Sequence, residues 1–481
     1  MSTSAELPEV TEFERLLRKP NSDATGFAGF FNGGGIVFNR VPARLDIMGG
    51  IADYSGANVC EGVLGSGIAI ALQPRTDRTL RIRTVQVGHR SLPVETRLPL
   101  DYLEAGDALG TYGQVRELCR ANPLSSWAAY IGGSIFTLLK EEGVQLPFGF
   151  SLLLLSNVPM NVGIGSSAAT EIAVLRCLQS HLDLKISETR LAQLGQLAEN
   201  QVVGAPCGIM DQIAVTSGRA GNLTHILCRP GSVEGTVKIP AGTAFVGINS
   251  MVKHSVGGSA YGDVRIGAFM GRKIINTDRA ARSLAPMNYL TELTPAEYEA
   301  EYRALLPERM LGSQFLADFR THDDPVTVVQ PDAEYRVQGP TAHPVYENDR
   351  VLRFMDALRA ANDGDQGALV TAGEQMYGAH ASYQENCRLS VDEVDFLVEA
   401  VRKRGPERGL YGAKITGGGS GGVVAIFGTT EGIAREVPAI AEEYKRRVGK
   451  LPDVFEGTSP GAAEFGTIRY EFGSTGWKRS A

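Results

Sequence analysis

The chain has 481 residues, of which 43% are hydrophobic and 21% charged, and its formal net charge is −7. This balance is typical of a folded globular protein and excludes a chain that is mainly disordered or a coiled coil. Lysines and arginines are scattered, without the basic block that nucleic acids or anionic membranes attract, so we expect a small-molecule partner. The 57 glycines, about 12% against a usual 7%, indicate many turns or close backbone approaches.

Cysteine usage and the N-terminus predict the compartment. The six cysteines are widely spaced and form no CxxC pair, which favours reduced thiols. The first residues lack the basic and apolar regions of a signal peptide, and the longest apolar run, near 148–155, is too short to cross a bilayer. We therefore expect a soluble, cytoplasmic protein, whose oligomeric state the sequence does not indicate.

The first half of the chain predicts a mixed α/β arrangement. An amphipathic helix over 11–19 precedes two β-branched runs, 68–73 and 79–85, and the turn residues between these runs predict a hairpin. A helix over 126–142 follows. Next comes an apolar strand over 151–158, a glycine–serine loop and another helix.

The second half begins near Pro240 with an apolar strand over 243–249. The later segments alternate between helical and strand patterns: helices over 349–361, 365–383, 390–403 and 431–447, and strands over 412–416, 423–427 and near 453. This order predicts helices on one face of a small antiparallel sheet. We therefore expect an α+β fold with two domains, 1–238 and 239–481, and a surface excursion over the proline-rich segment 325–344.

The strongest local motif is the glycine–serine loop between the strand over 151–158 and the next helix. It reads Pro159-Met-Asn-Val-Gly163-Ile-Gly165-Ser166-Ser167. Backbone N–H groups at a helix N-terminus bind anions, and glycines let a phosphate approach closely, so we interpret the segment as a phosphate loop. Ser167 can supply a hydroxyl to Mg²⁺, and Glu171 lies on the same helix face. A helix cap beside an ordinary turn is the alternative.

A second glycine run joins two predicted strands. It reads Thr416-Gly417-Gly418-Gly419-Ser420-Gly421-Gly422. Five glycines around one serine cost more backbone entropy than a hairpin requires, which favours close approach to a ligand over a flexible turn.

Three charged residues interrupt an apolar segment near the N-terminus: Arg44, Asp46 and Asp53. Buried charges are costly unless they are paired or functional, so this segment is either a structural salt bridge or part of a site. Asp211 has a similar apolar, glycine-punctuated setting. This suits a carboxylate that accepts a proton and is oriented by an arginine, although a helix N-cap fits as well.

Together these segments resemble the GHMP sugar and metabolite kinases. Residues 41–56 are similar to the galactokinase-type opening signature, 159–168 to the P-x-x-x-G-[IL]-[GS]-S-S-A phosphate loop, and 416–422 to the T-G-G-G-x-G-G loop. Other segments resemble the galactokinase branch in spacing: 206–212, 254–261 and 376–382. The resemblance spans residues 38–470.

Within that branch the chain most resembles the subfamily that phosphorylates L-arabinose. The segments that carry this likeness are 44–56, 203–212, 254–258, 343–348 and 455–462. In plants the kinase part of this subfamily follows a glycosyltransferase-like part, which the sequence lacks, so we expect a free-standing kinase.

The resemblance implies a GHMP kinase fold, with an N-terminal mixed α/β domain, a C-terminal ferredoxin-like antiparallel sheet with helices, and an active site in the cleft between them. It implies phosphorylation of the anomeric hydroxyl of a monosaccharide, L-arabinose first, with ATP and Mg²⁺. Asp211 is then the general base or orienting carboxylate and Arg44 its partner, with Ser167 and Glu171 at the metal. The expected phosphate-binding residues are Gly163, Gly165, Ser166, Ser167, Gly417, Gly418 and Gly419; the expected sugar-binding residues are Gly50, Asp53, Cys207, Gly208 and Tyr261.

One departure from the galactokinase pattern concerns the substrate. Galactokinases read Gly-Glu-His-Thr-Asp-Tyr, with the Glu and His at the sugar's hydroxymethyl end, where this chain reads Gly49-Gly50-Ile51-Ala52-Asp53-Tyr54. L-Arabinopyranose lacks that hydroxymethyl group, and a site without polar partners there leaves a hexose hydroxyl unpaired. We therefore interpret Gly50 as a removed side chain that favours a pentose.

Other functions stay open. The same resemblance fits a galactokinase, a uronate kinase or an N-acetylhexosamine kinase, although Gly50 and Ile51 offer no cation for a uronate. A non-catalytic sugar sensor of the same fold is a further alternative. It is disfavoured because Arg44, Ser166 and Asp211 are all present, as is the full second glycine loop.

Overall fold

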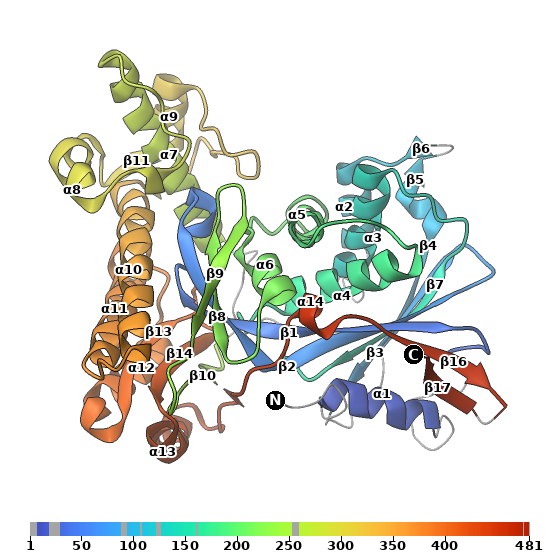
Figure 1. The fold of residues 1–481 in the computed structure, drawn as a ribbon. Coiled ribbons are helices and arrows are strands. Elements are labelled where there is room, and N and C mark those ends of the chain that lie inside the picture. The colour runs from blue at the N-terminus through green and yellow to red at the C-terminus, as the bar shows by residue number, and fades with distance from the viewer. Residues whose placement is uncertain are drawn as a thin grey trace.

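The structure is a computed structural model, built around two sheets (Figure 1). It describes residues 7–18, 29–87, 94–105, 108–121, 127–159, 162–252, 259–474 and 476–480. The segment 254–258 and the beginning of 254–261, which carry part of the family resemblance, lie outside the described residues.

Among the described residues, the larger sheet has nine strands. Seven follow the order β17-β16-β1-β2-β7-β3-β4, and β8 pairs with both β2 and β9. The strands are β1 (Ile36–Met48), β2 (Asn58–Pro74), β3 (Thr79–Gln86), β4 (Glu95–Pro99), β7 (Phe150–Ser156), β8 (Asn222–Leu227), β9 (Ser232–Lys238), β16 (Ile468–Gly473) and β17 (Gly476–Ser480). A short separate pair joins β5 (Glu104–Ala105) and β6 (Ala108–Leu109).

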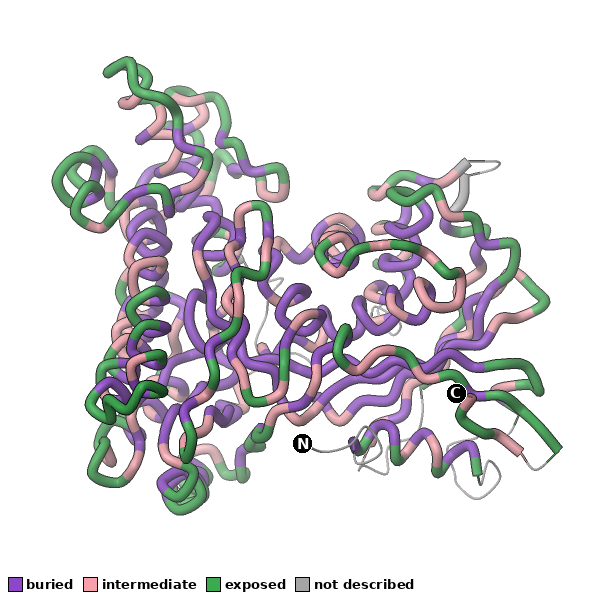
Figure 2. The backbone as a smooth tube through the Cα atoms, in the orientation of Figure 1, coloured by how far each residue is buried: buried purple, intermediate pink, exposed green. Residues whose placement is uncertain are grey.

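Helices cover both faces of this sheet, which explains its continuous apolar runs. One face packs on α1 (Pro8–Arg18), and the other mainly on α4 (Ser166–His181) and α6 (Met210–Ser217), with α2 (Tyr112–Arg120), α3 (Ala128–Glu142) and α5 (Glu188–Leu197) packed around these two (Figure 1). In β7, Leu152 and Leu154 belong to the core under α3 and α4, whereas Leu153 and Leu155 belong to the core with α1. The strand is therefore buried on both sides (Figure 2).

The predicted hairpin of 68–73 with 79–85 is wrong, because β7 lies between the two strands. Strand β2 pairs with β7 antiparallel, and β3 pairs with β7 parallel. The turn between β2 and β3 contacts the residue just before β7, because the N–H of Gly149 donates to the Asp77 carbonyl at 2.7 Å. Local turn residues indicate that the chain reverses direction there. They give no information about a strand about seventy residues further along the chain that lies between the two.

The smaller sheet is antiparallel, with the order β13-β14-β10-β15, and confirms the predicted helix-on-sheet arrangement. Its strands are β10 (Thr243–Asn249), β13 (Leu410–Ile415), β14 (Val423–Thr429) and β15 (Val454–Phe455). The helices of this half are α7 (Ser259–Ala281), α8 (Pro295–Glu297), α9 (Gly312–Phe319), α10 (Gln338–Asn362), α11 (Ala368–Ser382), α12 (Asp392–Arg404) and α13 (Thr430–Val448), with a two-stranded sheet of β11 (Arg309–Leu311) and β12 (Glu334–Arg336). None of the helices described is long and apolar enough to cross a membrane.

Two further expectations are corrected. The expected domain 239–481 does not belong entirely to the smaller sheet. Its C-terminal part joins the larger sheet, because β16 pairs with β1 and follows the short helix α14 (Ala462–Phe465). The second half of the proline-rich segment is not a surface excursion, because Pro340 and Pro344 lie buried within α10. Proline is tolerated in the first helical turn, where the missing N–H has no partner, which accounts for Pro340.

Candidate active site

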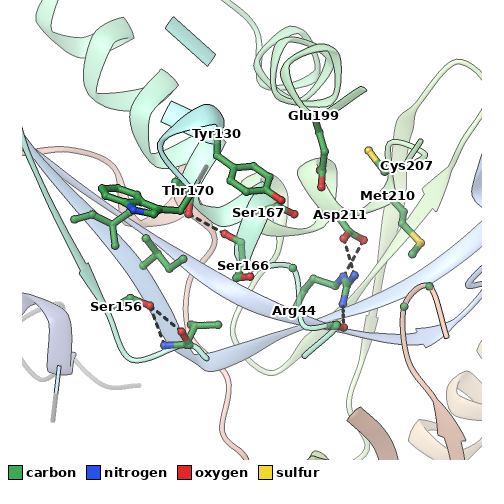
Figure 3. Close-up of a pocket in the computed structure, with 18 of the residues that line it drawn as sticks. Arg44, Tyr130, Ser156, Ser166, Ser167, Thr170, Glu199, Cys207, Met210 and Asp211 are labelled. Atoms are coloured by element: carbon green, nitrogen blue, oxygen red, sulfur yellow. Dashed lines mark hydrogen bonds and ion pairs between the residues drawn. The ribbon is translucent and has the colours of Figure 1, made fainter. Parts of the chain in front are cut away.

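A cavity of about 360 Å³ lies where the helices of the larger sheet meet the loop between β13 and β14 (Figure 3). This is the size range of small-molecule sites. Most residues that the sequence singled out line it: Arg44, Asp53, Gly163, Gly165, Ser166, Ser167, Cys207, Gly208, Asp211, Tyr261, Gly417 and Gly418. Segments more than 350 residues apart in the chain therefore share one cavity.

Arg44 and Asp211 form a bidentate ion pair in this cavity. The Nε of Arg44 donates to Asp211 Oδ1 at 2.8 Å and its Nη2 to Oδ2 at 2.6 Å, while Nη1 donates to the Gly163 carbonyl at 2.7 Å. The Arg44 side chain is 4% exposed and that of Asp211 19%. Burial by itself lowers the pKa of Arg44, but the carboxylates of Asp211 and Glu61 hold that pKa above its ordinary value. Arg44 is thus a fixed cation that orients Asp211.

The two glycine loops meet beside this pair. Gly165 caps α4 in a left-handed conformation, with φ of 73°, and a Cβ there would lie 2.9 Å from Arg44 Cγ. On the opposite side, a Cβ on Gly417 would lie 3.1 Å from the Gly163 carbonyl oxygen. The N-terminus of α4 therefore faces the cavity between two backbone segments that allow close approach, which is the arrangement that anion binding requires.

Asp53 forms the other end of the cavity, in the short helix η2 (Asp53–Ser55). A Cβ on Gly208 would lie 1.7 Å from Asp53 Oδ2, so only glycine fits against this carboxylate. Burial, together with the charge of Asp211, raises the pKa of Asp53 to about 6. Tyr261 and Cys207 line the same end, and burial raises the pKa of both side chains.

An acidic group that the sequence analysis missed is Glu199, in the π-helical turn η5 (Ala198–Val203). Its carboxylate lines the cavity and accepts hydrogen bonds from Ser167 and from Gln212 Nε2, the latter at 2.8 Å. Burial, together with the charge of Asp211, raises the pKa of Glu199 to about 7. In Figure 3 the side chains of Glu199, Ser167 and Asp211 point toward one space.

Glu171, the predicted metal ligand, lies farther from the cavity than Glu199. It is fully buried and accepts from the same Gln212 Nε2 at 3.1 Å, and it does not belong to the described lining of the cavity. Burial and the charge of Glu199 raise its pKa well above the ordinary value. Glu171 thus reaches Ser167 only through Gln212 and Glu199. The polar run of Glu199 to Gln201 resembles a solvated surface and gave no signal of its own.

Two other predicted residues are also displaced from the described cavity wall. A Cβ on Gly50 would lie 2.0 Å from Tyr383 Oη and 2.1 Å from Asp46 Oδ2, so this glycine reflects tight packing and not a space left in a sugar pocket. A Cβ on Gly419 would lie 2.7 Å from Leu389, which places that residue against the protein interior. Ile51, next to Gly50, does line the cavity.

The remaining wall is largely apolar and was not predicted. It extends along β3, β7 and the start of α3, and comprises Ile68, Thr84, Val85, Gln86, Val94, Trp127, Tyr130, Leu154, Ser156, Val158 and Thr170. Met210, at the start of α6, also lines the cavity but lies beside Cys207 and Asp211 (Figure 3). An apolar wall beside an anion site suits a nucleoside next to its phosphates. The signal was absent from the sequence because β-sheet residues that line a cavity have the same apolar pattern as core residues.

Comparison with known proteins places this geometry in a family. The GHMP kinases N terminal domain profile matches residues 129–219. A galactokinase of Chloroflexus aggregans is 30% identical over 85% of this chain and 88% of its own length. The chain belongs to the GHMP kinase family. It lies in the sugar-kinase branch, with galactokinases and L-arabinokinase among its relatives.

Two further relatives refine the picture of this GHMP kinase. The L-arabinokinase of Arabidopsis thaliana is 37% identical over 92% of this chain, which spans 47% of that protein's length. The crystal structure of Lactococcus lactis galactokinase complexed with galactose superposes with a TM-score of 0.70 at 23% identity, covering 94% of this chain and 98% of the other. The expected two-part GHMP kinase fold is therefore confirmed.

Proposed function

We propose that this GHMP kinase transfers the terminal phosphoryl group of ATP to the anomeric hydroxyl of a monosaccharide, with L-arabinose as its preferred substrate. The observation that carries the proposal is the bidentate Arg44–Asp211 pair, which lies between the phosphate loop at one end of the cavity and Asp53 at the other. A sugar hydroxyl bound at Asp53 and a nucleotide phosphate bound at α4 then meet at Asp211.

The residues have distinct roles in this mechanism. Asp211 accepts a hydrogen bond from the reacting hydroxyl and receives its proton as the oxygen attacks phosphorus. Arg44 orients Asp211 and faces the negative charge that spreads over the transferred group. The N–H groups at the start of α4 face the phosphates, Gly417 and Gly418 let them approach from the opposite side, and the apolar wall excludes water.

The acidic groups at the phosphate end fit a Mg²⁺ ion. Glu199 and Ser167 present oxygens to one space, and burial together with the charge of Asp211 raises the pKa of Glu199, so a cation bound there would stabilise its carboxylate. The described residues form no group of three or more His, Cys, Asp or Glu side chains suited to a metal. Mg²⁺ usually takes one or two protein ligands and completes its shell with phosphates and water, so Ser167 and Glu199 would suffice. When bound, the ion neutralises phosphate charge.

L-Arabinose is preferred on two grounds. The Arabidopsis relative named L-arabinokinase is 37% identical to this chain, against 30% for the Chloroflexus galactokinase. Ile51 also brings an apolar side chain to the cavity, and an apolar wall leaves the extra hydroxyl of a hexose without a partner. Gly50 no longer supports the pentose, because its Cβ direction is occupied by Tyr383 and Asp46.

D-Galactose is the second candidate, since galactokinases match most of both chains. Purified protein with MgATP should release ADP fastest with L-arabinose in a panel that includes D-galactose, D-glucuronate and N-acetylgalactosamine. A higher kcat/KM with D-galactose would replace the substrate but keep the reaction. Folded protein that releases no ADP with any of the four sugars would contradict the proposal.

Glu199→Gln should raise the Mg²⁺ concentration for half-maximal ADP formation by about tenfold or more, because a neutral amide is a weaker magnesium ligand than a carboxylate. Titration of Mg²⁺ at fixed ATP measures this. Glu188→Gln, which changes a carboxylate paired with Arg176 outside the described cavity wall, is the matched control and should leave the titration unchanged. Equal curves for Glu199→Gln and the control would remove Glu199 from the metal site.

The rate should fall in acid because Asp53 must be ionised to accept a hydrogen bond from the sugar. Its raised pKa of about 6 places the midpoint there in the enzyme without bound sugar. We expect kcat/KM for the sugar, measured at saturating MgATP, to be flat above pH 7 and to fall about tenfold per unit below pH 6. The kcat profile is the internal control, because bound sugar stabilises the ionised carboxylate. A kcat/KM that stays constant down to pH 5 would contradict this role.

A further inference from the structure

The turn that carries Ile51 and Asp53 into the cavity is fastened by side chains of α10. Glu347 Oε1 accepts the N–H of Gly49 at 3.1 Å. His343 Nε2 lies 2.8 Å from the carbonyl oxygen of Gly50. One backbone group in each of the two residues before Ile51 is thus bound by one helix from the other half of the chain.

The far side of the same turn is held in a similar way. Asn348 Oδ1, also on α10, accepts the N–H of Asn58 at 2.9 Å. Thr291, in the short helix η6 (Leu290–Glu292), donates its hydroxyl to the carbonyl of Ser55 at 2.9 Å. Both flanks of the turn over 49–58 therefore depend on contacts with residues 291–348.

The chemistry of His343 fixes its hydrogen-bond pattern. A carbonyl oxygen only accepts, so Nε2 must carry the hydrogen that points to Gly50. Nδ1 lies 2.8 Å from Ser382 Oγ, which must then donate. Burial lowers the pKa of His343, in agreement with a neutral ring that has one donor and one acceptor. His343 and Glu347 are both 0% exposed and stand one helical turn apart on α10.

The turn itself has a strained conformation. Ile51 has a φ of 62°, which is unfavourable for a β-branched residue, and its side chain lines the cavity. Gly49, with a φ of 106°, has no space for a Cβ, which would lie 2.7 Å from Val59 Cγ1. Such conformations persist only where the surroundings determine them, and they occur often at functional sites.

We propose that His343 and Glu347 are positioning residues for sugar binding, which hold the strained turn so that Ile51 and Asp53 face the sugar. This inference rests on the proposed sugar kinase function. It gives a role to the segment over 343–348, which the family resemblance singled out without one. The two residues bind the backbone of the turn and are not part of the described cavity wall. They therefore affect sugar binding only by holding the turn.

The test compares variants along one helix face. Glu347→Leu removes the acceptor of Gly49, whereas Glu347→Gln keeps an oxygen in place. Val351→Ala, one turn further along α10 and fully buried, is the matched control for loss of stability. We expect Glu347→Leu to raise KM for the sugar about tenfold with KM for ATP within twofold, and Glu347→Gln to restore KM for the sugar to within threefold. His343→Phe should behave as Glu347→Leu.

Hydrogen exchange at the amides of residues 49–51 provides a readout that needs no substrate. Glu347→Leu should accelerate exchange at Gly49 at least tenfold, and Val351→Ala should not. Unchanged exchange, a parallel rise in both KM values, or the same KM shift in Val351→Ala would overturn the proposal. If the wild-type protein phosphorylates no sugar, the proposed function fails, but the exchange comparison still decides whether α10 holds the turn.

Discussion

Asp211→Asn should lower kcat by about a thousandfold or more while MgATP binds as in the wild type. An amide cannot take the proton of the sugar hydroxyl, and loss of a positioned base costs about 10²–10⁴ in rate. The amide nitrogen would also face donors of Arg44, whose other carboxylate, Glu61, lies 3.6 Å away. Single-turnover phosphorylation and nucleotide titration on the same preparation separate these effects.

The chain offers a matched control for this substitution. Asp77 forms a bidentate pair with Arg75, with both nitrogen–oxygen distances at 2.6 Å, outside the described cavity wall. Asp77→Asn removes the same charge from the same kind of pair and should leave kcat unchanged. If Asp211→Asn keeps more than a tenth of the wild-type kcat, or if both variants lose equally, Asp211 has no part in the chemistry.

Much of the fold followed from the sequence because its signals are local. The strand over 243–249 and the four helices predicted in the second half, observed as α10 to α13, have apolar patterns that the packing satisfies directly, whereas α7 and α9 were not predicted. The errors in sheet topology share one cause. Strand β7 enters between β2 and β3, and β16 returns to β1, and both are pairings between segments far apart in the chain. Local turn and strand patterns do not indicate which distant segment a strand pairs with.

The residues of the candidate site were likewise predictable only where a local motif marks them. Motifs with unusual composition, such as the two glycine loops and the charged segment with Arg44, were visible and converge on one cavity. Glu199 was not visible, because its neighbours are polar and only the tertiary structure buries it. Gly50 was misinterpreted because a glycine shows that a side chain is absent, and only the packing shows which atoms fill its place.

The second large effect concerns stability and involves Asp46, which the sequence placed beside Arg44. Lys414, on β13, pairs with Asp46, on β1, at 3.0 Å, and both side chains are 0% exposed. Asp46 Oδ2 also accepts the N–H of Gly417 at 3.0 Å, and Thr416 Oγ1 accepts the N–H of Asp46 at 2.9 Å. This buried pair therefore joins the larger sheet to the second glycine loop.

Lys414→Met should lower the free energy of unfolding by about 3–5 kcal/mol, because it leaves the Asp46 carboxylate buried without its cation. The control is Lys445→Met, which breaks an exposed pair with Glu442 and should cost less than about 1 kcal/mol. Denaturant titration of both variants measures the difference. Asp46 also holds Gly417, so Lys414→Met should weaken nucleotide binding even at temperatures where the protein stays folded. If Lys414→Met loses no more free energy of unfolding than Lys445→Met does, this ion pair does not hold the two halves of the site together.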